Sequence, residues 1–460
     1  MRESNRSRVP AGILAVVLLL AAAAATTAFL AVGPAAQVKI EPGARAIGRK
    51  TPVVVRVAEP GKGLVRVRVE FQQGDRVETL AEKSYAHRSA LAFWGPRTGH
   101  DEIRLEVGRD TVPGLRSGDA SIRVTADRVG SWLRKPDPVV EIATLPVRLT
   151  PPSLEVRSTQ AYVAQGGCET VVYRVGESAV RDGVRVGEWW FPGFALPGAA
   201  KQDRFALFAV PYSAAAPNVR LVAADDAGNE AEMSFVEKFF PKPFRADTIA
   251  LTDEFLNKVV PEIVSQTPDF QDRGGLLANY LAINGELRKK NAAALGELAR
   301  RSRPEFLWSR PFQMMPNGKV MSAFADRRTY RYGDRDVDHQ DHLGFDLAVT
   351  RRAPIPAANS GRIVLAKYFG IFGNAVVIDH GYGLMSLYGH LASISVKEDQ
   401  QVQRGDILGQ TGETGLAGGD HLHFTMLLQG LPVNPVEWWD GHWIADRIVR
   451  KLGPALHFEE

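Results

Sequence analysis

Alternating apolar and polar positions dominate the first part of the chain. Between residues 38 and 149, apolar side chains recur at every second position in short segments separated by turn-forming residues, among them 52–57, 63–69 and 120–125. A period of two is typical of half-buried β-strands, and strands at this regular spacing predict a β-sandwich-like module over residues 37–150. The segment carries no cluster of His, Cys and carboxylate residues, so we expect an accessory or spacer role.

A second β-rich stretch begins at Pro151 and Pro152, which mark a boundary. Strand-like runs at residues 169–175 and 184–190 predict a second β-sandwich-like module over residues 151–244. Within it, an acidic pair precedes Ala-Gly-Asn, a sequence typical of a turn between strands. Calcium binding by this pair is the weaker interpretation, because no further ligand spacing follows.

The period changes to that of a helix between residues 245 and 305. Thr252 is placed to cap a helix that begins with two acidic residues. Apolar side chains then follow at helical spacing, at Leu277, Tyr280, Leu281, Leu295 and Leu298. The pattern predicts a helical connector, with Arg288 and the two lysines after it on the solvent-exposed face.

Short strands with many glycines return in the last third of the chain. Segments 361–366, 375–379 and 384–389 are typical of strands in a compact barrel-like sheet. They predict a compact antiparallel β domain over residues 306–440, followed by a C-terminal tail at residues 441–460. The predicted fold class is therefore mainly β, with two β-sandwich-like modules and a helical connector before this domain.

The N-terminal segment combines basic residues with a long uncharged run. Three arginines within the first eight residues precede residues 11–32, which are rich in Leu, Val and Ala and carry no charge. This run is long enough to span a membrane, and Pro34 disfavours cleavage at the small residues just before it. We therefore expect an uncleaved transmembrane signal anchor within residues 1–36 rather than a removed signal peptide, with the rest of the chain outside the cytoplasm.

The composition limits the classes of partner. The chain has 460 residues, 45% hydrophobic and 23% charged, which is enough apolar material for several cores. The formal net charge is +4 and the sequence pI about 9.0, but no block of Lys and Arg dominates any region, which argues against nucleic acid. Cys168 is the single cysteine, so no intramolecular disulfide can form, and we expect it to be buried as a small apolar residue.

Six of the ten histidines fall between His339 and His423. HLGFD at 342–346 opens this segment and DHLHF at 420–424 closes it. On a β-strand, residues two apart share a face, so each run presents two polar groups on one side, and Gly344 leaves space between those of the first run. Imidazole and carboxylate are good zinc ligands, and a catalytic zinc site usually has three protein ligands and one open position. The combination predicts a metal site, with one histidine left over to handle protons.

Further short motifs occur in a fixed order around these runs. HLGFD is followed by HGYG at 380–383, YGHL at 388–391, GDILG at 405–409, TG at 411–412, HLHF at 421–424 and NP at 434–435. With these motifs, residues 321–439 resemble the lysostaphin-like, or LytM-type, zinc endopeptidases, which cut peptide bonds in bacterial peptidoglycan. The resemblance covers about a quarter of the chain.

The resemblance implies a role for each polar residue. It makes His342, Asp346 and His423 the zinc ligands, with His390 and His421 as the catalytic pair beside the metal-bound water that attacks the scissile carbonyl. The sequence contains no HExxH, so histidine takes the place of the glutamate base that many zinc peptidases use.

Three features near the motifs bear on this assignment. Residues 416–420 are LAGGD where many relatives carry a Ser-Thr-Gly-Pro run, so we expect a different loop along the cleft and a different accepted peptide. His339 is an extra histidine expected at the surface, with a supporting role beside the ligands as the alternative. His380 is expected to be structural or to support the site rather than to bind metal.

Three functions are compatible with these residues. The first is a zinc endopeptidase in the bacterial inner (cytoplasmic) membrane, single-pass, whose catalytic part faces the periplasm or cell wall and acts on peptidoglycan stem or cross-bridge peptides. The second is a catalytically silent envelope scaffold that binds peptidoglycan or activates another cell-wall hydrolase. Such relatives typically lose ligands, whereas this chain keeps all five polar positions. The third is a peptidase of secreted proteins. Envelope proteins are expected partners of the β modules, and the helical connector is a candidate inhibitory lid.

Overall fold

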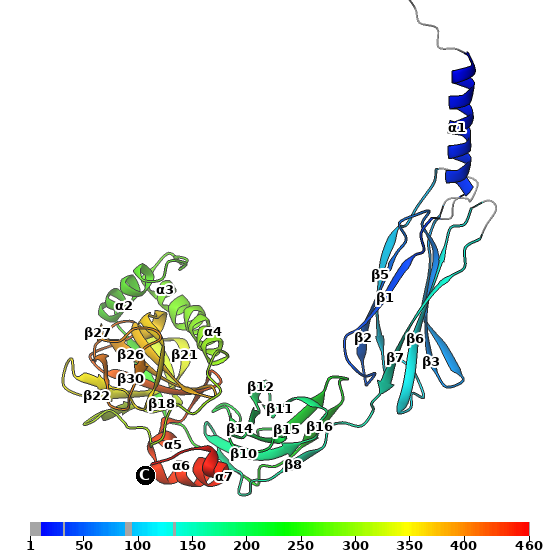
Figure 1. Ribbon diagram of the computed structural model, residues 1–460. Helices are drawn as coiled ribbons and strands as arrows, with labels where there is room; N and C mark the ends of the chain where they lie inside the picture. The colour runs from blue at the N-terminus through cyan, green and yellow to red at the C-terminus, as the bar shows by residue number, and fades with distance from the viewer. Residues whose placement is uncertain (1–10, 31–32, 88–93, 132–134, 460) are drawn as a thin grey trace, which may run out of the picture. The chain divides into compact units, whose positions relative to one another are not determined.

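Figure 1 shows the computed structural model of the chain, which describes residues 11–30, 33–87, 94–131 and 135–459. The chain is mainly β, as the sequence predicts, and folds into two compact units. One unit comprises residues 1–151 and 224–230, and the other comprises residues 152–223 and 231–460. The finer domain boundaries expected within the second unit stay predictions.

The N-terminal segment forms α1 (Ala11–Leu30), a helix of 20 residues. The expected membrane span at residues 11–32 is not supported, because over the described ranges the structure has no helix that is both long and apolar enough to cross a membrane. Arg2, Arg6 and Arg8, from which the orientation of the chain was predicted, lie outside the described residues.

The first unit is built from two antiparallel sheets, with the strand orders β1-β2-β5 and β4-β3-β6-β7. Their strands are β1 (Gln37–Pro42), β2 (Thr51–Ala58), β3 (Leu64–Gln73), β4 (Arg76–Ser84), β5 (His100–Val107), β6 (Gly118–Arg128) and β7 (Val139–Val147). Along β2, Val53, Val55 and Val57 are buried and alternate with more exposed positions, which is the period of two that the sequence shows. Their side chains form the core of this unit.

The second unit begins with two four-stranded sheets, β13-β14-β10-β8 and β12-β11-β15-β16. Their strands are β8 (Leu154–Val156), β10 (Cys168–Val175), β11 (Ala179–Val186), β12 (Trp189–Pro192), β13 (Phe194–Ala195), β14 (Asp203–Ala209), β15 (Val219–Asp225) and β16 (Glu230–Met233). A parallel pair, β9 (Tyr162–Ala164) and β17 (Lys238–Phe240), accompanies them. Cys168 is buried, as expected, and forms no disulfide. Oδ1 of Asp225 accepts the backbone N–H of Ala227 and of Asn229, which confirms the predicted turn.

The expected helical connector is helical only from residue 253. Before it, β18 (Ala246–Leu251) is a strand, which corrects the helix expected from residue 245. The helical part consists of α2 (Asp253–Ser265), α3 (Leu276–Ala282), a π-helical turn (Ile283–Leu287) and α4 (Arg288–Ala299). Oγ1 of Thr252 accepts the backbone N–H of Phe255 at 3.1 Å, so the predicted cap is confirmed.

The C-terminal domain is organised on one large sheet. Its order is β19-β22-β30-β26-β25-β24-β28, and β31 pairs with β30. The strands are β19 (Lys319–Ser322), β22 (Phe345–Ala348), β24 (Gly361–Tyr368), β25 (Asn374–Gly381), β26 (Leu384–Leu391), β28 (Gln401–Val402), β30 (Leu422–Leu428) and β31 (Leu431–Val433). The central strands β26 and β30 are buried along their whole length, so their inward side chains sit on a rigid support.

Two smaller sheets flank the large one. In the first, β20 (Asp326–Tyr332) lies between β21 (Arg335–His342), to which it is antiparallel, and β18, to which it is parallel. The second consists of β23 (Pro354–Pro356), β29 (Ile407–Gln410) and β27 (Ser393–Ile394). Through β18, the connector thus adds an edge strand to the sheet whose opposite edge strand, β21, ends at His342.

The C-terminal residues expected as a tail fold into short helices. These are α6 (Gly441–Ile444), a π-helical turn (Ala445–Val449) and α7 (Arg450–Leu452), and they follow α5 (Pro435–Trp439), which precedes the expected tail (Figure 1). The Nζ of Lys451 lies 2.7 Å from Oε1 of Glu169 in β10, and both side chains are largely buried. The last helices are thereby tied to the second β segment.

One hydrophobic core runs from the second β segment into the C-terminal domain. Tyr382, in the turn between β25 and β26, packs edge-on against Phe194 and Phe205, with ring centroids 4.8 and 4.9 Å away. Trp438 is fully buried in the same core. The two segments therefore stabilise each other through shared apolar contacts.

Glu437 in α5 makes this core sensitive to pH. Its Oε2 accepts the backbone N–H of Cys168 at 2.7 Å, and burial raises the pKa of Glu437 from 4.5 to about 8. Between these pH values the unfolded chain releases a proton that the folded chain keeps. The free energy of unfolding therefore falls as the pH rises from about 4.5 to 8.

The variant Glu437→Gln keeps an acceptor for the Cys168 N–H but cannot ionise. We expect it to raise the free energy of unfolding near pH 8 by on the order of a few kcal/mol, and to change it little near pH 4.5. Denaturant unfolding at the two pH values checks this, with Glu254→Gln at an exposed position of α2 as the control. An equal shift at both pH values would show that ionisation of Glu437 is not the cause.

Candidate metal centre

Three polar side chains from three strands converge at one end of the large sheet. His342 is the last residue of β21, Asp346 lies in β22 and His423 lies in β30. The register pairs Asp346 directly with His423 on the neighbouring strand. The short turn between β21 and β22 brings His342 to the same place, so the local spacing of HLGFD and the pairing of β22 with β30 together assemble the group.

The facing atoms of this group are spaced as metal ligands. Nε2 of His342 lies 3.0 Å from Oδ1 of Asp346 and 3.1 Å from Nδ1 of His423, and the last two atoms are 2.9 Å apart. A tetrahedral ion with bonds of about 2.0–2.2 Å needs ligand atoms roughly 3.3 Å apart, so a small outward shift would seat one. Among the described residues, these three form a group able to hold a metal ion.

Hydrogen bonds behind the two histidines fix which nitrogen faces the centre. Nδ1 of His342 donates to the carbonyl of Ala323 at 3.0 Å, which leaves Nε2 to face Asp346 and His423. Nε2 of His423 donates to Oγ1 of Thr425 at 3.0 Å, and that hydroxyl donates to the carbonyl of Leu343. Supporting acceptors of this kind orient metal-bound imidazoles and hold their tautomers.

Gly344 has no room for a side chain. A Cβ at this position would lie 2.7 Å from Cε1 and Nε2 of His423 and 2.6 Å from Oγ1 of Thr425. The space expected beside Gly344 is therefore filled by His423 and Thr425. A larger residue at this position would displace His423 from the centre.

Arg328 supports the carboxylate from the other side. Its Nη2 donates to Oδ2 of Asp346 at 2.9 Å, so Oδ1 is the oxygen left to face the two histidines. No sequence motif points to Arg328, because it lies in β20 and reaches the site only through the pairing of β20 with β21.

His390 and His421 lie beside the group of His342, Asp346 and His423. Nδ1 of His390 donates to the carbonyl of Thr414 at 2.7 Å, and Nδ1 of His421 donates to the carbonyl of Gly419 at 2.8 Å. Each imidazole thus presents Nε2, and the two ring centroids are 4.9 Å apart. His390 has a φ of 66°, a left-handed conformation that is uncommon for residues other than glycine and is often found at functional sites.

Burial and mutual charge separate the pKa values in this group. Burial acts to raise the pKa of Asp346, but the neighbouring imidazoles, His342 foremost, outweigh it and hold the pKa well below the usual value. Burial lowers the pKa of His423 to about 4 and that of His390 well below its ordinary range. For His421, burial is outweighed by the hydrogen bond and charge of Asp346, so its pKa is raised. The two histidines beside the ligand group therefore differ in basicity.

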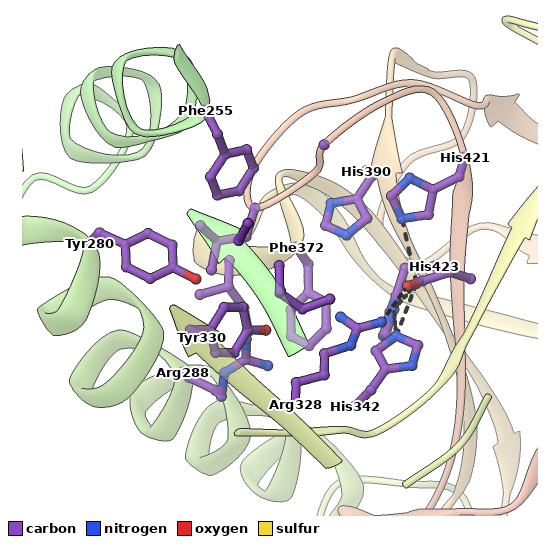
Figure 2. A pocket seen from close by; sticks show the side chains of 16 residues that line it. Phe255, Tyr280, Arg288, Arg328, Tyr330, His342, Phe372, His390, His421 and His423 are labelled. Atoms are coloured by element: carbon purple, nitrogen blue, oxygen red, sulfur yellow. Dashed lines mark hydrogen bonds and ion pairs between the residues drawn. The ribbon is translucent and has the colours of Figure 1, made fainter. Parts of the chain in front are cut away.

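These residues line one end of a pocket of about 320 Å³ (Figure 2). His342, His390, His421 and His423 lie on one side of the view, and Phe255, Tyr280, Tyr330 and Arg288 lie on the other. Leu416 and Gly418 also line it, so the loop with the unusual LAGGD sequence borders the pocket, as expected. The volume is at the lower end of the range for ligand sites.

The two histidines set aside in the sequence analysis lie away from the centre. His339 is exposed on β21 and lies close to Thr329. His380 is fully buried, with Nδ1 2.8 Å from the carbonyl of Ser360 and Nε2 2.8 Å from Oγ of Ser386, and burial lowers its pKa to about 4. His380 is therefore structural, as predicted.

A His/Asp/His group with two further histidines beside it has the donor types of a catalytic metal site. Residues 340–435 match the family model described as Peptidase family M23, whose members are generally metallopeptidases. Residues 340–435 thus form a peptidase family M23 domain, and the relatives of the chain include peptidoglycan endopeptidases, as the sequence motifs predict.

Three curated relatives illustrate the similarity. The peptidoglycan DD-endopeptidase ShyA of Vibrio cholerae is 31% identical over 166 residues, 36% of each chain. The DD-carboxypeptidase/endopeptidase Mpg of Neisseria meningitidis is 40% identical over 95 residues, 21% of this chain and 22% of the relative. The murein hydrolase activator EnvC of Escherichia coli is 31% identical over 123 residues, 27% and 29% of the two chains. The chain thus matches about a third or less of the length of these relatives.

A solved structure gives a similar match. The catalytic domain of lysostaphin from Staphylococcus simulans is 26% identical, with 27% of this chain and 92% of that chain covered and a TM-score of 0.24.

Proposed function

We propose that the chain is a zinc-dependent endopeptidase that hydrolyses peptide bonds in peptidoglycan stem or cross-bridge peptides. The observation that carries the proposal is the buried group of His342, Asp346 and His423, with Nε2 of His390 and of His421 presented beside it. The proposal takes the first three as metal ligands and the last two as catalytic residues. The similarity to ShyA and Mpg, whose names describe peptidoglycan or DD-peptide cleavage, supports this substrate class.

The arrangement suits hydrolysis of a peptide bond. A zinc ion held by the three ligands would polarise a scissile carbonyl and lower the pKa of a water molecule toward neutrality. His390 and His421 donate their Nδ1–H to backbone carbonyls, so each can accept a proton only at Nε2. One of them can take a proton from the attacking water and return it to the departing amine. The aromatic and aliphatic side chains around the pocket restrict the access of bulk water to these steps.

The second candidate is an envelope scaffold that activates another cell-wall hydrolase. The similarity to EnvC, named a murein hydrolase activator, favours it. Against it stands the complete set of five polar residues with their supporting hydrogen bonds, which a scaffold does not need. Envelope proteins as partners of the β segments, and a catalytic part that faces the periplasm or cell wall, belong to the proposal and stay predictions.

Release of muropeptides from purified peptidoglycan by the full chain tests the proposal. We expect release by the purified protein, its loss on treatment with a chelator, and its return on addition of zinc but not of magnesium. Elemental analysis should find about one zinc ion per chain. A folded, zinc-loaded protein that binds peptidoglycan and releases nothing would favour the scaffold, and release that is unaffected by the chelator would exclude the metal mechanism.

A further inference from the structure

A second cation lies on the pocket wall away from the histidines. Arg288, the first residue of α4, lines the pocket and is half-buried, whereas the two lysines after it are exposed. The prediction that Arg288 lies on the solvent-exposed face was therefore wrong. Figure 2 shows Arg288 below Tyr330, on the side opposite His390 and His421. It contacts none of the proposed metal ligands.

Arg288 forms no ion pair with any described residue. Its Nε and Nη2 donate to the carbonyl and to Oδ1 of Asn284, one helical turn earlier, at 3.1 and 2.5 Å. Asp338 is a nearby carboxylate, but its oxygens accept hydrogen bonds from Asn284, the backbone of His339 and Gln340. The guanidinium has five N–H groups, so donors remain for a ligand in the pocket.

Tyr280 supplies a second donor on the same wall. Its side chain is only 1% exposed, yet its hydroxyl has no hydrogen-bond partner among the residues that the structure describes. Its ring is fixed by edge-on contacts with Phe255 and Tyr330, with centroids 6.2 and 6.1 Å away. In Figure 2 the hydroxyl points into the pocket. A hydroxyl that faces the pocket and is not engaged by the chain is free to donate to an acceptor on a ligand.

Among the groups that line the pocket, Arg288 has no carboxylate paired with it. The lining residues include two guanidinium groups, Arg288 and Arg328, and a single carboxylate, Asp346. Arg328 is already paired with that carboxylate at 2.9 Å. The apolar side chains of Ile249 and Phe255 border the same wall and would strengthen an ionic contact by keeping water away.

We propose that Arg288 and Tyr280 form a subsite that binds a carboxylate of the substrate peptide while the scissile bond of that peptide lies beside His390 and His421. The planar guanidinium suits a carboxylate, and the tyrosine hydroxyl adds a third donor. The subsite deepens the proposed function, on which it rests, by making peptides with a carboxylate near the scissile bond the preferred substrates. The carboxylate is either the free C-terminus of the peptide or an acidic side chain.

The test compares matched synthetic peptides of the stem type that carry a carboxylate or a carboxamide. One pair differs at the C-terminus and a second pair differs at a side chain, so the two sources of the carboxylate are distinguished. We expect the zinc-loaded wild type to prefer the acid of one pair by about 10- to 100-fold in kcat/KM, mainly through a lower KM. Arg288→Gln should abolish this preference, and Arg288→Lys should keep part of it.

Two further variants separate binding from structure. Lys289→Gln, at the exposed neighbouring position, should keep the full preference for the acid. Tyr280→Phe preserves the ring contacts and should lower the preference several-fold, so it keeps the proposal testable if Arg288→Gln does not fold. An Arg288→Gln variant that cleaves acid and amide with equally reduced efficiency, and so keeps the ratio between them, would assign Arg288 a structural role and overturn the subsite.

The outcome also distinguishes the subsite from the catalytic proposal. Equal cleavage of acid and amide by the wild type would overturn the subsite while the endopeptidase stands. If the wild type cleaves neither peptide, the proposed endopeptidase activity is rejected. Equilibrium binding of the two peptides in the presence of chelator then tests the subsite. Tighter binding of the acid that Arg288→Gln abolishes would then support it, and equal binding of acid and amide would overturn it.

Discussion

Replacing His423 by alanine should leave the purified chain without bound zinc and lower peptidoglycan hydrolysis by about three orders of magnitude or more. The variant removes one of three ligands and opens a cavity beside Asp346, whose Oδ1 lies 2.9 Å from Nδ1 of His423. Two ligands do not hold zinc firmly at ordinary concentrations of free metal. The measurements are elemental analysis of the purified variant and the rate of muropeptide release.

His339→Ala is the matched control for this prediction. It removes the same side chain from an exposed position of β21, next to the strand end that carries His342, and should leave both zinc content and rate unchanged. A His423→Ala protein that retains a full equivalent of zinc and the wild-type rate would falsify the assignment of His423 as a ligand.

His390→Ala and His421→Ala should each lower kcat by roughly 10²- to 10⁴-fold while zinc content stays at the wild-type level. Neither imidazole belongs to the group of three ligands, and each is held through Nδ1 by a backbone carbonyl that remains in the variants. The loss therefore concerns proton transfer rather than metal binding. Single-turnover cleavage of a stem peptide together with metal analysis separates the two effects.

The double variant sharpens this second prediction. If the two imidazoles act on the same proton transfer, losing both should cost little more than losing the more important one, because such effects are strongly non-additive. Multiplicative losses would instead indicate two independent steps. Loss of zinc from either single variant would contradict the division between ligands and catalytic residues.

The site was more accessible to sequence reasoning than the pocket around it. In HLGFD and in DHLHF the polar residues are two or four positions apart, so local strand geometry brings the residues of each motif together. The sequence does not show that β22 and β30 pair, and this pairing joins the two motifs. Arg328 was not predicted as a site residue, because no local spacing in the sequence connects it to Asp346. Its position depends on the register of β20 with β21, which pairs Arg328 with Gln340, two residues before His342.

The connector shows why local period alone is insufficient. Residues 246–251 form a strand because they pair in parallel with β20, and pairing of this kind overrides a weak local preference. Arg288 was predicted to lie on the solvent-exposed face of the helix because of its charge. It lies seven residues from both Leu281 and Leu295, so the helical period itself puts it beside the apolar stripe. A prediction based on charge alone therefore misplaces a cationic residue that lies on the buried side of a helix.

The shared core of the second β segment and the M23 domain has a consequence for how the molecule can be divided. Because Tyr382 packs on Phe194 and Phe205, and Lys451 pairs with Glu169, a cut near residue 305 would remove packing partners from both sides. A truncated fragment that starts there would carry the complete catalytic motif on an unprotected, aggregation-prone surface. A fragment for biochemical work should therefore include the second β segment together with the M23 domain, because both sides of the shared core are then present.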